Sequence, residues 1–461
     1  MQENKPKQAP LCIDFLVIGA GVAGLACAIA LRRVGHRVLV IEREKQIGES
    51  DASRAVRMPP NLSKILYHWD LKPEVYSVAA KSKAIQISRF ETGDLLGRHY
   101  WDEEVLRETR GEFLFAHLAD VRKMMYDVAV AKGATIRLNA TAVAVDPERR
   151  IVTLASGENL KADVIVGAEG ASGLVRPLLL REQGIEEATE PRYCMYSATI
   201  PESLAVTDLH CKKFFETEVT TMFSFFGNDQ SVISHPLGGS PAFSFCLYRP
   251  WDEYEDSPIS GMRAALEEAE PRLKNLGPLM LPPRRFPILE YPALDDWVDE
   301  TGRVVVIGGA AHTIPTGSTQ YYAMGVEDGA VLAKLFSHLH THDQISDFLY
   351  AFQDLRQPRC ATVLASETGI IQYMGMPNGP DQEMRDQGMR AKAAMGGNVL
   401  EASGDQEESP EWAEIKNVFG YDAEDEADNW WVSWGLLKQR SMGTLVDLAV
   451  GALQIQMAAV S

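Results

Sequence analysis

The pattern of apolar and polar positions predicts an α/β chain interrupted by a β-rich segment. Apolar runs at 13–18 and 37–42 flank a helical pattern that ends at Gly35. This order predicts a strand, a helix and a second strand in close succession. The same periodicities predict further strands at 135–145, 151–154, 161–166 and 303–307, and helices at 62–69, 118–130 and 325–338.

Between residues 193 and 248 the periodicity changes. Stretches such as 220–226 and 242–248 alternate apolar and polar side chains, which is typical of antiparallel strands with one buried face. Buried strands of the α/β pattern lie on both sides of this segment. We therefore predict one domain assembled from discontinuous pieces and a β-rich domain inserted into it.

The turn after the first predicted strand carries the most specific motif of the chain. Its G-x-G-x-x-G pattern places Gly19 at the tight turn, Gly21 at the approach to a pyrophosphate, and Gly24 where helix and strand pack closely. Free N–H groups at the start of the following helix favour phosphate. Glu42 ends the second strand, where an acid accepts the ribose hydroxyls of an adenosine. These features predict a dinucleotide site.

Composition narrows the class of protein. The chain has 461 residues, of which 46% are hydrophobic and 24% charged, as in soluble globular proteins. Its net charge of -19 argues against a nucleic-acid partner, because phosphates need Lys and Arg. The six cysteines form no C-x-x-C pair. This argues against a disulfide framework or a structural zinc site and favours a reducing, cytoplasmic compartment.

The two ends of the chain carry no strong export or membrane signal. Residues 1–10 are polar and lack the apolar core of a secretory signal. The apolar run at 445–460 contains Asp447, Gln454 and Gln456, so we expect an amphipathic helix and no integral membrane span. That helix would pack on the body or on a partner subunit, which leaves a homodimer open. Peripheral membrane contact is the alternative.

Three blocks, in this order, resemble those of the flavin-dependent aromatic hydroxylases, the class A flavoprotein monooxygenases, and especially their salicylate-hydroxylase-like members. The first block is 19–42. The second is Gly167-Ala168-Glu169-Gly170 with Val175-Arg176, similar to the family's G-A-D-G…V-R. The third is Gly308-Gly309-Ala310-Ala311-His312 with Pro315, Glu327 and Asp328, similar to G-D-A-A-H…P…E-D.

The resemblance implies an α/β fold with a Rossmann-like (GR2-type) FAD-binding domain, an inserted β-sheet substrate domain and a helical C-terminal region. It also implies FAD, NAD(P)H as reductant, O₂, and an aromatic or natural-product small molecule as substrate. The chain has no second G-x-G-x-x-G, as in this family, whose reductant binds without a domain of its own. The predicted ranges are 12–75, 112–185 and 285–345 for the FAD-binding domain, 76–111 and 186–284 for the substrate domain, and 346–461 for the helical region.

Positions that contact the flavin in this family depart from its pattern. Gly309 replaces an Asp that accepts a hydrogen bond from the ribityl chain. Losing such an acceptor costs on the order of 1.5–3 kcal/mol. Thr319 and Tyr321 replace two glycines beside the flavin ring, and any side chain there adds bulk.

Two functions fit these observations. In the first, FAD binds and the enzyme hydroxylates its substrate, with decarboxylation if the ring carries a carboxyl group. In the second, the scaffold has lost or repurposed FAD, and its pocket catalyses a non-redox cyclisation or isomerisation of a natural-product intermediate. A non-catalytic flavin-binding or scaffold protein is a third interpretation, which no residue specifically supports.

The candidate cofactor contacts lie in the three blocks and in the segments beside them. Glu169 is one methylene longer than the usual Asp, and Leu118 stands where many relatives carry an Arg that reaches the phosphates. Arg122, one helical turn further on, is the candidate replacement. The predicted contacts are Gly19, Gly21, Gly24, Glu42, Ala55, Arg122, Glu169, Gly170, Gly309, Pro315 and Tyr322.

Four residues are candidate catalytic residues: His312, His235, Arg57 and Tyr321. His312 titrates near neutrality and suits acid–base chemistry, although the matching His of the family is more often structural. Arg57 would pair with a pyrophosphate or with a substrate carboxylate. The phenols of Tyr321 and Tyr322 would matter most for a non-redox reaction, because they would fill space that the flavin ring takes in relatives. The expected pocket liners are Tyr193, Tyr196, Phe225, His235 and Tyr321.

Overall fold

A parallel sheet at one end of the molecule forms the predicted strand–helix–strand unit. The computed structural model describes residues 6–48, 51, 53–187, 190–239, 241–253, 257–400 and 417–436. Five strands pair in the order β18-β12-β1-β2-β8, all in parallel. Their bounds are β1 Asp14–Ile18, β2 Arg37–Ile41, β8 Thr135–Arg137, β12 Val164–Gly167 and β18 Val304–Val306.

Three helices pack on one another beside this sheet. Helix α1 (Val22–Arg33) contacts both α10 (Tyr321–Phe336) and α5 (Leu118–Ala131). Nine of the twelve residues of α1 are buried, because its apolar positions face the sheet on one side and α10 on the other. Parallel strands covered in this way read as continuous apolar runs, which is why the sequence pattern located β1, β2, β12 and β18.

A second sheet at the other end is larger and mostly antiparallel. Its seven strands pair in the order β17-β13-β16-β15-β14-β5-β6, and only β14 and β5 run parallel. The two faces of this sheet belong to two separate apolar clusters. Its strands are β5 Ala84–Arg89, β6 Leu95–Tyr100, β13 Pro191–Pro201, β14 Thr221–Phe226, β15 Ser231–Pro236, β16 Ala242–Pro250 and β17 Arg284–Leu289.

Two small sheets complete the β-structure. Strands β3 (Ala55–Met58), β7 (Leu114–His117) and β4 (Ala79–Lys81) pair antiparallel. Strands β9 (Ala142–Asp146), β10 (Ile151–Leu154) and β11 (Asn159–Lys161) form an antiparallel meander.

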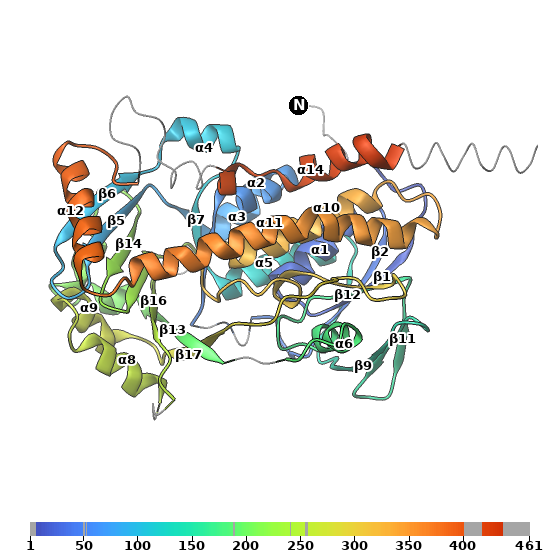
Figure 1. Ribbon diagram of the computed structural model, residues 1–461, viewed down its shortest axis with the longest axis horizontal. Helices are drawn as coiled ribbons and strands as arrows, with labels where there is room; N and C mark the ends of the chain where they lie inside the picture. The colour runs from blue at the N-terminus through green and yellow to red at the C-terminus, as the bar shows by residue number, and fades with distance from the viewer. Residues whose placement is uncertain are drawn as a thin grey trace, which may run out of the picture.

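The long helix α11 (Gln344–Met374) ties the two ends together. Figure 1 shows it running along the molecule from the parallel sheet toward the seven-stranded sheet, where α12 (Pro380–Ala394) lies. Helix α14 (Ala423–Trp430) packs against α10 and continues into a π-helical turn, η5 (Trp431–Gly435). The remaining helices are α2 Pro60–His68, α3 Lys72–Val78, α4 Glu103–Thr109, α6 Val175–Glu182, α7 Glu202–Ala205, α8 Pro258–Leu266, α9 Pro271–Leu276, η2 Cys211–Phe214, η3 Gly277–Leu279 and η4 Gly308–Ala310.

The α/β fold with its β-sheet insertion and helical C-terminal region is confirmed, with two local differences. The strand expected at 135–145 is split, because Asn139 adopts a left-handed φ of 55° and directs the chain out of the parallel sheet. Strand β17 pairs with β13 in the large sheet, although we assigned 285–345 to the FAD-binding domain. The exact domain ranges stay a prediction.

Two further expectations concern membranes and cysteines. Within the ranges that the structure describes, no helix is both long and apolar enough to cross a membrane. The amphipathic helix expected at 445–460 lies outside the described residues. All six cysteines are free thiols, and five of them are buried.

The contact between Gly24 and Gly19 yields a stability prediction. A Cβ at Gly24 would overlap the Gly19 carbonyl oxygen, so Gly24→Ala should lower the free energy of unfolding by about 1–3 kcal/mol. The matched control is Gly388→Ala in α12, where an added Cβ meets nothing within 4 Å. That change should be neutral or stabilising by roughly 0.5–1 kcal/mol. Urea unfolding would measure both, and equal effects would contradict the packing argument.

Candidate functional site

A cleft of about 510 Å³ lies at the carboxyl ends of β1, β2 and β12. Residues from all three sequence blocks meet there, because parallel strands present their carboxyl ends at one edge of the sheet. The cleft continues from the ends of β2 and β9 to the first turn of α10. Its lining includes Gly19, Gly21, Glu42, Arg43, Glu44, Asp51, Arg54, Leu118, Arg122, Thr141, Glu169, Gly170, Ser172, Gly308, Gly309, Tyr321 and Tyr322.

The glycine turn has the conformation that its motif predicts. Gly19 has φ of 103°, and an added Cβ would lie 2.7 Å from the Ala168 carbonyl oxygen. Gly21 caps the N-terminus of α1, and a Cβ there would meet nothing within 4 Å. The backbone at Gly21 is therefore open to the cleft. Gly24 is not part of the cleft lining; it serves the close contact between α1 and the turn.

Glu42 and Arg122 hold this turn from two sides. The Glu42 carboxylate accepts hydrogen bonds from the backbone N–H groups of Ala20 (2.7 Å) and Glu44 (2.9 Å). The Arg122 guanidinium donates to the Ala20 carbonyl (3.1 Å) and to Asp51 (2.6 Å). Both side chains are buried at the cleft wall. Arg122 thus lies where the sequence placed a cation, although nearby carboxylates already balance its charge.

The second and third blocks face each other across the cleft. Glu169 caps α6, because its carboxylate accepts from the N–H groups of Leu174 and Val175, both at 3.1 Å. Burial raises the pKa of this carboxyl. The extra methylene of Glu169, compared with the usual Asp, lets the carboxylate reach the N-terminus of α6. A Cβ at Gly309 would lie 3.5 Å from the Gly170 Cα, so these two glycines are in close contact.

A small cavity of about 20 Å³ lies between the seven-stranded sheet and the loop that precedes α10. Arg54 and Tyr322 line both this cavity and the cleft. Ala55, predicted as a cofactor contact, lines the small cavity instead of the cleft. The lining comprises Arg54, Ala55, Arg57, Met195, Ser197, His235, Cys246, Thr316, Gly317, Ser318 and Tyr322.

Arg57 is one of the two arginines that line the small cavity. It is 6% exposed, and its Nη2 donates to the Gly317 carbonyl and to the Tyr248 hydroxyl (3.4 Å). Nη1 has no hydrogen-bond partner among the described residues. A buried donor without a partner is costly, so this corner of the cavity is built to receive an acceptor.

His235 lies beside Arg57 as a neutral ring. Its imidazole stacks on Phe115 with centroids 4.2 Å apart. Burial and the Arg57 guanidinium lower the pKa of His235 to about 3. At neutral pH it therefore contributes shape and a hydrogen-bonding ring nitrogen, but no charge.

Three of the expected pocket liners are not in either cavity lining. Tyr196 and Phe225 belong to the apolar cluster on the opposite face of the large sheet, and Tyr193 lines neither cavity. The expectation was wrong for Tyr196 and Phe225 because side chains alternate between the faces of a strand. Tyr193, two residues before Met195 on β13, is outside both linings. Met195 and Ser197, the neighbours of Tyr196 on β13, face the small cavity.

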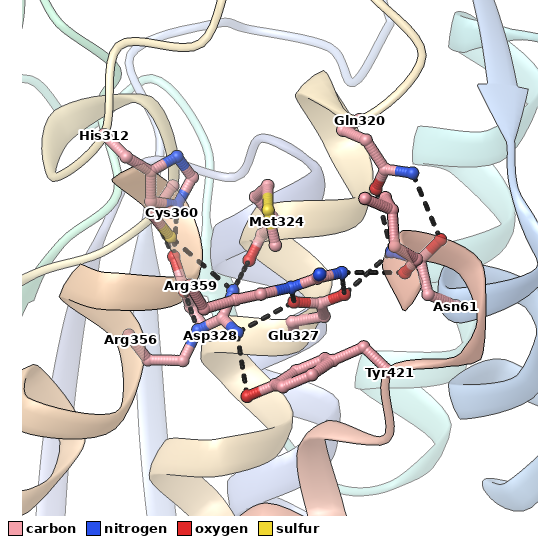
Figure 2. A network of polar contacts seen from close by, with 12 residues as sticks. Asn61, His312, Gln320, Met324, Glu327, Asp328, Arg356, Arg359, Cys360 and Tyr421 are labelled. Atoms are coloured by element: carbon pink, nitrogen blue, oxygen red, sulfur yellow. Dashed lines mark hydrogen bonds and ion pairs between the residues drawn. The ribbon is translucent and has the colours of Figure 1, made fainter. Parts of the chain in front are cut away.

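His312 lies in a buried network that lines neither cavity (Figure 2). Its Nε2 is 2.7 Å from the Asp328 carboxylate, which also bonds Arg356. Burial opposes the charged ring, but Cys360 and Asp328 raise the pKa of His312 to about 10. The acid–base role predicted for His312 is therefore not supported by its position. Pro315 also lines neither cavity; its carbonyl accepts from the Ser318 N–H.

Several residues of the site were missed in the sequence. Arg54 directly precedes Ala55, a predicted cofactor contact, and this adjacency was the available signal. Glu367 accepts from the N–H groups of Thr319 (2.9 Å) and Gln320 (3.1 Å) at the start of α10. It comes from α11, far along the chain, and no local pattern points to it.

The comparisons with known proteins agree with this geometry. Residues 13–367 match the family described as FAD binding domain. The chain is similar to the FAD-dependent monooxygenase OpS4 of Beauveria bassiana, with 26% identity over 82% of this chain and 89% of that protein. It is also similar to 6-hydroxynicotinate 3-monooxygenase of Bordetella bronchiseptica, with 26% identity over 75% and 88%.

Solved structures share the fold. The chain superposes on CtdE in complex with FAD and a substrate with a TM-score of 0.75 and 16% identity, over 93% of this chain and 100% of that one. For a salicylate hydroxylase substrate complex the TM-score is 0.68 and the identity 18%, over 90% and 98%. The chain belongs to the FAD-binding domain family, and with it to the flavoprotein monooxygenases.

The residues of the cleft suit FAD. The open backbone at Gly21 and at Gly170, where an added Cβ meets nothing within 4 Å, leaves room for a cofactor. The N-terminus of α1 and the side chains of Arg43 and Arg54 along the cleft favour its phosphates. Gly309 and Tyr321 line the same cleft, beside the start of α10.

The His312–Asp328 pair gives a pH-dependent stability prediction. The pKa of His312 is about 10 in the folded protein and near 6.5 when unfolded. The contribution of the charged His312 to the free energy of unfolding is therefore complete below about pH 6.5, and it is lost as the pH rises through about 10. His312→Gln should lower the free energy of unfolding by about 3 kcal/mol at pH 7.

The measurement is urea unfolding of both proteins at pH 7 and pH 10. The wild type should lose more stability than His312→Gln over this interval, because the variant has no imidazolium to titrate. Identical losses would show that His312 is not charged in the folded protein.

Proposed function

We propose that this protein is an FAD-dependent hydroxylase of an aromatic or natural-product small molecule that carries an acidic group, with NAD(P)H as reductant. The observation that carries this proposal is the buried Arg57, whose Nη1 has no partner in the described chain, in a cavity that shares two wall residues with the FAD cleft. Two similar proteins are named for ring substrates with a carboxylate, 6-hydroxynicotinate and 3-amino-4-hydroxybenzoate.

The small cavity suits one polar group of a substrate. Its volume of about 20 Å³ is close to the room that a single water needs. We infer that the acidic group enters this cavity and pairs with Arg57, while the ring extends past Arg54 and Tyr322 toward the cleft. A guanidinium pairs well with a carboxylate in this way, through parallel N–H groups.

The reaction inserts one atom of O₂ into a C–H bond and releases the other as water, with two electrons from NAD(P)H. The bound flavin would supply the electron transfer and the activation of O₂. The protein's part is to position the substrate and to exclude water. Arg57 fixes the acidic end, and the neutral His235 packed on Phe115 keeps that wall uncharged.

The first test is the absorption spectrum of the purified protein, with released flavin quantified after denaturation. We expect near-stoichiometric FAD that bleaches when NADH or NADPH is added without oxygen. With oxygen and a panel of hydroxybenzoates and hydroxynicotinates, the product should gain one oxygen atom. Substrate conversion without oxygen and without a mass change would refute the hydroxylase and favour a non-redox cyclase or isomerase on this scaffold.

The role of Arg57 has a separate test. Arg57→Met removes the cation but keeps an apolar stem, so KM for an acidic substrate should rise by at least tenfold, since a buried charge-assisted hydrogen bond contributes about 1.5–3 kcal/mol. The matched control is Arg192→Met on the exposed end of the same sheet. A neutral amide analogue of the substrate should show no such difference, and an unchanged KM for the acid would exclude pairing with Arg57.

A further inference from the structure

One departure from the family pattern places two unusual residues next to each other. Gly309 and Tyr321 are twelve positions apart in the chain, on η4 and on the first turn of α10. A Cβ added at Gly309 would lie 3.7 Å from the Tyr321 hydroxyl oxygen. Both residues line the cleft. The phenol therefore lies where a side chain at position 309 would enter the cleft.

The surroundings fix the Tyr321 phenol in this place. Its ring stands edge-on to Tyr322, with centroids 4.9 Å apart and an angle of 87°. Arg54 interacts with the Tyr321 hydroxyl. The Arg54 guanidinium is in turn held 3.7 Å from Asp51 and 5.2 Å from the Phe286 ring centroid. The hydroxyl is thus oriented by a cation that is itself anchored.

We propose that the Tyr321 hydroxyl makes the polar contact to the ribityl chain of FAD that glycine at position 309 cannot make. This inference rests on the proposed function, because it concerns how the cofactor is held. A phenol both donates and accepts hydrogen bonds, so it serves a polyol as a carboxylate does. The glycine at 309 and the tyrosine at 321 are then two parts of one exchange. The hydrogen-bond acceptor moves from position 309, after β18, to position 321 at the start of α10.

The two positions are in contact. An aspartate at 309 would bring its Cβ into van der Waals contact with the Tyr321 hydroxyl and the Gly170 Cα, so its carboxylate and the phenol would lie next to each other in the cleft. The family pattern combines an aspartate at 309 with a glycine at 321, whereas this chain combines Gly309 with Tyr321. The substitutions are therefore expected to be non-additive.

The test is FAD affinity of the apoprotein, measured by flavin fluorescence quenching. Tyr321→Phe should weaken FAD binding roughly tenfold, as expected for one buried hydrogen bond. Affinity for ADP, which lacks the ribityl chain, should stay unchanged and would show that the adenosine end is intact. Tyr350→Phe, which removes an exposed phenol on α11 outside both cavity linings, is the matched control and should bind FAD as the wild type does.

The exchange itself is tested by a double-mutant cycle. Gly309→Asp combined with Tyr321→Gly should restore FAD affinity to within about threefold of the wild type, whereas Tyr321→Gly alone should lose at least tenfold. Undiminished FAD binding by Tyr321→Phe, or an equal loss in Tyr350→Phe, would overturn the inference while leaving the hydroxylase proposal standing. A wild-type protein that binds no FAD would overturn both.

Discussion

The Asp328 carboxylate is the interaction on which the arrangement of the site depends. It accepts from the Gly308 N–H (2.7 Å), from His312 (2.7 Å) and from Arg356 (2.8 Å), and is fully buried. Burial would raise the pKa of Asp328, but His312 and Arg356 lower it to about 2. Burying a carboxylate charge costs free energy unless the charge is paired and hydrogen-bonded, and these three partners meet that condition. This one group joins the loop after β18 to α10 and α11.

The neighbouring Glu327 extends the network to the rest of the site. Its carboxylate pairs with Arg356 (2.8 Å) and accepts from Asn61 (2.7 Å), which also donates to Gln320 (2.8 Å). Figure 2 shows these side chains meeting between α2, α10 and α11. Through Asn61, these contacts hold Gln320 at the N-terminus of α10. Tyr321 and Tyr322 are the first two residues of α10, directly after Gln320, and their side chains line the cleft.

Two departures from the family pattern, Gly309 and Tyr321, line the cleft. The buried side chains of the third block, including Glu327 and Asp328, keep the family's residues. The framework that sets the backbone is thus intact, and the surface offered to cofactor and substrate is rebuilt. A conserved framework with a changed cleft surface is expected when one fold serves several functions, because function depends on the site and not on the fold.

The sequence by itself determined the parallel sheet, the glycine turn and the inserted β-rich segment, because apolar periodicity and glycine spacing are local properties. It placed Gly19, Gly21, Glu42 and Arg122 around one cleft, where the structure also has them. Only the tertiary structure decided which face of β13 meets the cavity, that His312 is enclosed with Asp328, and that Gly309 adjoins Tyr321. Those outcomes depend on strand register and on contacts between distant segments, which no local pattern encodes.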